Sequence, residues 1–188
     1  MQQIGLHGAL FSLGMKPFYT LIAFGLALSM TAANLANAGT AAQAADLFDF
    51  WVGDWSVSWK NSDGTAGKAR NRVAKVLDGL VIEENFEQEG GDPPPLLRGR
   101  SLSVLQVASG TWKQAWADNQ GGFFALTGSV EGDKRIFATD VRTEGDKQRA
   151  QRMVFYAIQP DSFSWDWEGT SDGGRSWTLL WRLEYRRR

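Results

Sequence analysis

The sequence contains no cysteine among its 188 residues and a single histidine, His7. Without cysteine, disulfides, thiol catalysis and cysteine-ligated metal sites are excluded, and the fold must rely on a hydrophobic core. His7 lies in a segment that we expect to be removed. The remaining domain then lacks the residue needed for Ser-His-Asp hydrolysis and for histidine ligation of zinc or haem. We therefore expect no cofactor, and in particular no haem.

The sequence also has no large excess of positive or negative charge. Lys16 is the sole charged residue before Asp46, so removal of the leader leaves 19 of the 20 basic residues against 21 acidic ones. Nucleic-acid binding requires a concentrated basic surface. The near-neutral balance therefore predicts a protein that does not bind nucleic acid.

The uncharged N-terminal segment has the features of a secretory leader. Lys16 directly precedes the apolar run 21–30, and Ala36-Asn37-Ala38 has the small-x-small pattern of a signal peptidase site. We expect a signal peptide at 1–38 and an exported, periplasmic or extracellular protein without a stable membrane span after cleavage. An uncleaved anchor is the alternative, because the uncharged run is long enough to span a bilayer.

Two details of the leader remain open. Ala42-Gln43-Ala44 is a second candidate cleavage site. Met15 is a better translation start than Met1, because residues 1–14 would place a long uncharged extension before the positive charge.

Residues 46–188 read as one all-β domain. Turn-forming clusters rich in Gly, Asp, Asn and Pro recur at short intervals and separate segments with two-residue alternation. Such a series predicts an antiparallel up-and-down β-barrel of about ten strands, since closure removes exposed edges. A two-sheet sandwich is the alternative, although no long crossover connection is evident. The expected strands are 54–60, 66–77, 80–88, 97–107, 111–118, 123–130, 134–142, 148–159, 162–170 and 176–186.

Tryptophan is abundant, with nine residues, and strand alternation places most of them on inward faces. We expect eight to point into the barrel and Trp51 to plug one end; the eight are Trp55, Trp59, Trp112, Trp116, Trp165, Trp167, Trp177 and Trp181. Because each buries roughly 150–250 Å², they could fill the interior completely. Alternatively they line a pocket, in which case the expected ligand-binding residues are Trp59, Trp112, Trp116, Trp165 and Trp167.

Alternation also places two charged side chains near the expected interior. Glu84 shares a face with apolar neighbours, and Arg100 shares one with Leu102 and Val104. If those apolar residues point inward, Arg100 does too, and it is expected to pair with Glu84 because an unpaired buried charge is costly. In one alternative these charges have no ligand role, because they either form a structural pair or face outward. In the other, Arg100 is an anchor that binds a ligand carboxylate.

The segment Thr170 to Trp177 fits the Asp-box pattern, Ser/Thr-x-Asp-x-Gly-x-Ser/Thr-Trp. Asp172 is expected to accept backbone N–H bonds, Gly174 to supply a positive φ, and Trp177 to pack beneath the turn. Sialidases repeat this motif around a propeller. A single copy in a short chain predicts a structural hairpin instead.

Gly53-x-Trp55 on the first strand, with Arg182 or Arg186 on the last, resembles the lipocalin and calycin pattern. The segments 48–55 (FDFWVGDW), 110–116 (GTWKQAW) and 171–177 (SDGGRSW) extend the resemblance to nearly all of 46–188, and are similar to an exported bacterial lipocalin-like family with an FDFWxGxW opening. The resemblance implies a calycin-like barrel in which the arginine closes over the first-strand tryptophan. It supplies no catalytic residues. Related nitrobindin-type barrels bind haem through a histidine, which this domain lacks.

These observations favour a binding protein over an enzyme. The expected ligand is a small apolar or amphipathic molecule held in an aromatic-lined barrel. One alternative is a cofactor-free enzyme with Glu84 as its acid or base, because burial would raise the pKa of that carboxyl. The other is a filled barrel with a structural or protein-binding role.

Overall fold

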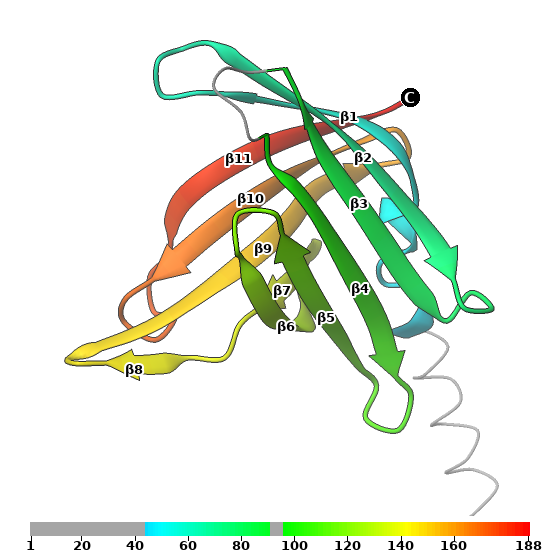
Figure 1. Cartoon of the computed structure of the whole chain (residues 1–188). Coiled ribbons are helices and arrows are strands. Elements are labelled where there is room, and N and C mark those ends of the chain that lie inside the picture. Colours follow the sequence, from blue (N-terminus) through cyan, green and yellow to red (C-terminus); the bar gives the residue numbers. More distant parts are fainter. Residues whose placement is uncertain (1–43, 91–95) are drawn as a thin grey trace, which may run out of the picture. The chain divides into compact units, whose positions relative to one another are not determined.

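The computed structural model describes residues 44–90 and 96–188, and the predicted signal peptide lies outside them. The all-β prediction is confirmed (Figure 1). A 3₁₀ helix, η1 (Asp49–Trp51), precedes the strands β1 (Gly53–Lys60), β2 (Ala66–Val76), β3 (Val81–Glu89), β4 (Arg98–Gln106), β5 (Thr111–Asp118), β6 (Phe123–Glu131), β7 (Lys134–Ala138), β8 (Arg142–Glu144), β9 (Lys147–Gln159), β10 (Ser162–Thr170) and β11 (Thr178–Arg187).

Ten of these strands form a closed antiparallel barrel. Each of β1 to β6 pairs with the next strand, β9 pairs with both β7 and β10, and β11 joins β10 to β1. The short β8 pairs only with the start of β9 and projects with it from the wall (Figure 1). Closure between the first and last strands satisfies the backbone groups that an open sheet would expose at its edges.

One end of the barrel is closed by η1 and the residue before it. Phe48 and Trp51 are buried, and the Phe48 ring stacks on Phe137 at 4.3 Å between centroids. The Trp55 indole donates a 2.8 Å hydrogen bond to the Trp51 carbonyl, which fixes the 3₁₀ turn against β1. Apolar burial and this bond hold the plug in place, as expected for Trp51.

The seam between β1 and β11 carries a stacked arginine. Trp55 is fully buried and pairs in register with Arg187, whose guanidinium carbon lies 4.3 Å from the indole centroid. A side chain at Gly53 would collide with that guanidinium, so glycine permits the close approach. The expectation that Arg182 or Arg186 covers this ring was wrong, because the register brings Arg187 to Trp55.

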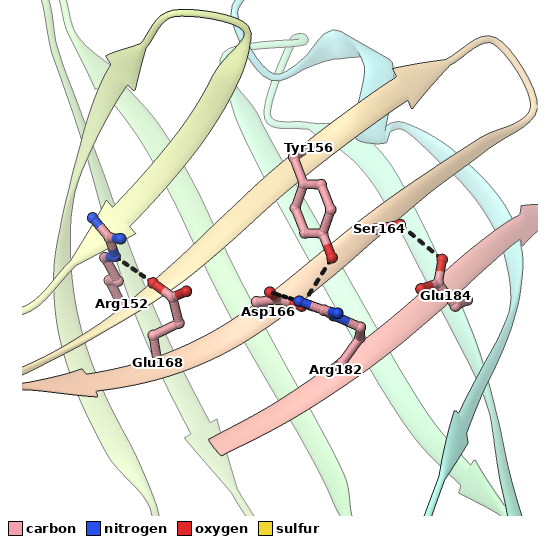
Figure 2. Close-up of polar contacts among 7 residues, drawn as sticks. All are labelled: Arg152, Tyr156, Ser164, Asp166, Glu168, Arg182 and Glu184. Atoms are coloured by element: carbon pink, nitrogen blue, oxygen red, sulfur yellow. Dashed lines mark hydrogen bonds and ion pairs between the residues drawn. The ribbon is translucent and has the colours of Figure 1, made fainter. Parts of the chain in front are cut away.

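Arg182 instead lies on the outer face of the barrel, in a row of polar contacts across β9, β10 and β11 (Figure 2). It binds Asp166 in a bidentate manner, with Nε–Oδ1 2.8 Å and Nη2–Oδ2 2.7 Å. Arg152 and Glu168 form a second pair at 2.7 Å in the same row. Asp166 faces outward but is almost fully buried, so Arg182 neutralises a carboxylate that is largely shielded from water. This bidentate pair joins β10 to β11.

A β-bulge reverses the orientation of the first part of β11. Trp167 pairs with Trp181 but Glu168 pairs with Leu179, so Leu180 is the extra residue on β11. The alternation therefore changes phase at Leu180. The prediction that Trp177 points inward was wrong: it packs outside the barrel, where the Arg152 guanidinium lies 4.1 Å from its ring centroid. The other tryptophans are either buried in the hydrophobic core or packed against it.

Candidate functional site

The inner face of β4 is opposite to the one predicted. Gly99, Ser101 and Ser103 are buried, whereas Arg100 and Leu102 are exposed, the latter by 52%. The reason is steric: the Trp116 indole lies directly over Gly99, where a Cβ atom would collide with it. The inward-facing indole of Trp116, on the neighbouring strand β5, leaves room only for small inward-facing residues beside it on β4, and Leu102 and Val104 point to solvent.

Arg100 therefore does not reach the interior, and the predicted pairing with Glu84 was wrong. Arg100 is exposed on the outer wall, beside outward-facing residues of β2 and β3. The hypothesis that it anchors a ligand carboxylate inside the barrel loses its basis.

A cavity of about 160 Å³ lies inside the barrel, at the end away from η1. Its deep part is formed by buried residues, among them Glu84, Leu183 and Tyr185, and its rim by half-exposed residues such as Leu97 and Asp118. Aromatic rings make up most of the wall. The remaining lining residues are Phe86, Trp116, Phe124, Met153, Trp165, Trp167 and Trp181.

The aromatic rings of the wall meet in both parallel and edge-on arrangements. Trp165 and Trp167 are parallel within 5°, with centroids 6.3 Å apart, and Trp181 stands at 89° to Trp165. Phe124 packs edge-on against Trp167, at 5.1 Å. Edge-to-face packing fixes each ring without filling the space between them, so the wall presents both faces and edges to the cavity.

Glu84 is the hub of a polar cluster at the floor of the cavity. One carboxylate oxygen accepts a 2.7 Å hydrogen bond from the Asn71 amide, and the other accepts one of 2.7 Å from the Ser101 hydroxyl. Asn71 also donates to the Tyr185 hydroxyl at 3.2 Å, and Gln114 donates to Ser101 at 3.3 Å. The members come from five strands, so this layer links opposite sides of the barrel.

The floor and the rim differ in electrostatics. Burial raises the pKa of Glu84 to about 7, although hydrogen bonds from Ser101 and Asn71 act to lower it. At the rim, burial opposes ionisation of Asp118, but hydrogen bonds from the Trp116 indole and the amides of Gly122 and Gln120 hold the pKa of this carboxyl below its usual value. Asp118 is therefore ionised at neutral pH, while Glu84 titrates there.

Three of the five tryptophans predicted to bind ligand line the cavity: Trp116, Trp165 and Trp167. Trp112 instead packs at the closed end, where its indole donates 2.7 Å to the Ala44 carbonyl. Trp59 stands behind Trp181 at 5.0 Å and donates to Asn61. The prediction for these two residues named the correct face of the strand but the wrong level along the barrel axis.

Residues that the sequence analysis did not assign to a site include Asn71, Ser101, Gln114 and Tyr185 of the floor cluster. Alternation placed Gln114 on the face of Trp112 and Trp116, and Tyr185 on that of Leu183. This shared face was the indication in the sequence that Gln114 and Tyr185 are buried. Buried polar side chains are expected to be hydrogen-bonded, which makes a polar cluster the expected result.

The Asp-box segment forms a tight turn outside the cavity. Asp172 accepts hydrogen bonds from the Ser176 amide at 3.0 Å and the Thr170 hydroxyl at 2.7 Å. A further hydrogen bond from the Ser176 hydroxyl contributes most to holding the pKa of Asp172 well below its usual range. Gly174 has φ +91° and approaches the Trp177 ring. These contacts account for the motif as a hairpin support.

No group of three or more His, Cys, Asp or Glu within residues 44–90 and 96–188 is placed to hold a metal ion. In the same part of the chain, none of the helices has the length and apolar character needed to cross a membrane.

Fold and site together define a closed antiparallel β-barrel with an aromatic-rich interior, plugged at one end. No protein-family model matches the chain, and no curated protein matches it in sequence.

Proposed function

We propose that this chain is an exported, lipocalin-like protein that binds a small apolar or amphipathic ligand in the aromatic cavity of its barrel. The observation that carries the proposal is the cavity itself: about 160 Å³ of space remains although four tryptophans are buried in the core and four more pack against it. An apolar cavity of about 150 Å³ is sufficient to take up benzene. This space argues against a barrel whose interior is completely filled.

The calycin relationship is part of the proposal. Arg187 covers the ring of Trp55 at the seam, which is the arrangement that the lipocalin pattern implies for the first and last strands. Gly53 makes room for that arginine. The family resemblance thus finds support in geometry at the barrel end, with Arg187 in the role expected for Arg182 or Arg186.

The binding proposal predicts saturable binding of neutral ring compounds such as cyclohexanol and benzyl alcohol, measured by titration calorimetry. Leu97→Trp should abolish the heat of binding, because Leu97 stands at the rim and the larger side chain would occupy the cavity. Leu179→Trp adds the same bulk on the outer face and is the matched control. Binding that survives Leu97→Trp would place the compounds elsewhere, and absence of binding to the wild-type protein would contradict the proposal.

A second candidate function is cofactor-free acid–base catalysis by Glu84. It is favoured by the position of this carboxyl in the cavity wall, by its lack of an arginine partner, and by its pKa near 7. Native mass spectrometry of protein recovered from the exported compartment distinguishes the two. A carrier should retain a small molecule in the wild-type protein, whereas an enzyme should retain an unconverted molecule in the Glu84→Gln variant alone.

Export is proposed from the leader sequence. N-terminal sequencing of the protein secreted by a bacterial host should begin at Gly39 or close to Ala45, the first because Ala36-Asn37-Ala38 is the better cleavage pattern. A mature chain that retains Lys16 would contradict cleavage of the leader.

A further inference from the structure

Carboxylates are the charged groups that line the cavity. Glu84 lies at the floor and Asp118 at the rim, and no lysine, arginine or histidine is among the described residues of the lining. Arg182 on β11 and Arg152 on β9 are paired with Asp166 and Glu168 on the outer wall. The charge inside the cavity is therefore negative and is not neutralised by a basic side chain of its wall.

The aromatic walls, like the carboxylates, favour a positively charged ligand. The face of an indole ring carries negative electrostatic potential and attracts a cation placed within about 6 Å of its centroid. Trp165 and Trp167 offer parallel faces, and Trp181 stands perpendicular to them. All three rings line the cavity, so a compact cation with apolar substituents held there can lie against an indole face.

We propose that the cavity binds an organic ammonium ion, with the cationic head against the tryptophans of the wall and above Glu84. This inference rests on the proposed binding function and specifies its ligand class. The cavity volume of about 160 Å³ matches a head group with methyl substituents. A bare, strongly hydrated ammonium would lose its water without enough hydrogen-bond acceptors in return, so an alkylated nitrogen fits better.

Three probes of the same shape test the proposal, because they differ mainly in charge. Choline is the cation, 3,3-dimethylbutan-1-ol its neutral isostere and 3,3-dimethylbutanoate the anion. Calorimetric titration of the wild-type protein at about pH 8 should show choline binding at least about tenfold more tightly than the alcohol, the difference expected for a desolvated cation–π site. The carboxylate should bind most weakly, because Glu84 and Asp118 repel it.

Variants locate the charge that produces this preference. Glu84→Gln should reduce the affinity for choline by about tenfold or more while leaving that for the alcohol nearly unchanged. Glu87→Gln removes the same charge from the exposed outer face of β3 and should have no effect. Arg100→Ala should also have none, because Arg100 is exposed on the outer wall.

The pH dependence provides a separate measurement. Asn71, Ser101 and Tyr185 face Glu84 within the floor cluster; burial raises the pKa of Tyr185 above its usual value, so Tyr185 stays neutral while Glu84 titrates. If the ionised carboxylate binds the cation, choline affinity should rise about tenfold between about pH 6 and pH 8, in proportion to the ionised fraction. The rise should disappear in Glu84→Gln and be absent for the alcohol.

The possible outcomes separate the two proposals. Equal affinity for choline and the alcohol, with both lost in Leu97→Trp, would overturn the ammonium inference and leave the binding function standing. A preference for choline that survives Glu84→Gln and shows no pH dependence would also overturn it. If the neutral ring compounds and all three probes fail to bind, both proposals are wrong.

Discussion

Replacing Trp55 with alanine is expected to lower the free energy of unfolding by about 3–5 kcal/mol, the range for deleting a large buried aromatic. Its indole is fully buried, packs edge-on against Phe163 at 4.9 Å and donates to the Trp51 carbonyl. Arg187 covers its other side. The substitution would therefore remove core packing, the bond that holds the plug, and the contact across the seam at once.

Urea unfolding followed by far-UV circular dichroism measures this loss without depending on tryptophan fluorescence. Trp177→Ala is the matched control, because it deletes the same side chain from the outer face, where Arg152 stacks on it. A loss of about 1 kcal/mol or less is expected there. Similar losses in the two variants would contradict the central role of Trp55 in closing the barrel.

The free energy of unfolding of the wild-type protein is expected to contain a contribution from Glu84 that falls by about 3 kcal/mol as the pH rises from about 4.5 to about 7. In the unfolded chain this carboxyl ionises near pH 4.5, whereas in the fold burial raises its pKa to about 7. Between these values the native state binds more protons than the unfolded state, so stability decreases with pH. Above pH 7 both states are ionised and the contribution is constant.

Glu84→Gln should remove this fall, because the introduced amide does not titrate. The difference in unfolding free energy between the wild-type and variant proteins, measured by urea unfolding at several pH values, isolates the contribution from that of other carboxyls. The buried Asn71 Oδ1 atom has no hydrogen-bond partner and can accept from the new amide if Asn71 rotates. Glu87→Gln on the outer face should keep the wild-type slope. Parallel profiles for wild-type and Glu84→Gln would contradict the assignment.

The strand order and the barrel followed from local features of the sequence. Turn residues such as Gly132 and Gly145 have positive φ, 61° and 64°, in the hairpins where they were expected. Two-residue alternation correctly assigned Trp112 and Trp116 to the inner face of β5. Antiparallel neighbours joined by short turns leave little freedom in topology, so these local patterns were sufficient for the architecture.

Alternation failed where a neighbouring strand or a bulge decides the orientation. On β4 the apolar Leu102 and Val104 point outward because the inner face is crowded by the neighbouring strand β5, whose Trp116 indole lies over Gly99. On β11 the single extra residue at Leu180 changes the phase, so Trp177 and Trp181 face opposite sides. Neither effect is encoded within the strand that shows it.

The floor cluster was the least predictable part of the site. Asn71 and Tyr185 are 114 residues apart in the chain and meet only because β1 stands between their strands in the closed barrel. Glu84 was recognised as a buried carboxyl, but its partners proved to be neutral amides and hydroxyls. Spacing along the sequence carries no information about contacts that depend on barrel closure and register.

The plug of Phe48 and Trp51 closes the end of the barrel away from the cavity. A ligand bound in the cavity would occlude the open end of the barrel, and the plug would prevent a competitor from entering at the other end. Exchange of one occupant for another must then wait for spontaneous departure, at a rate that a higher concentration of the competitor does not increase. The residence time would be set by contacts with the cavity wall and with the rim around Leu97 and Asp118, and would not depend on the concentration of free competitor.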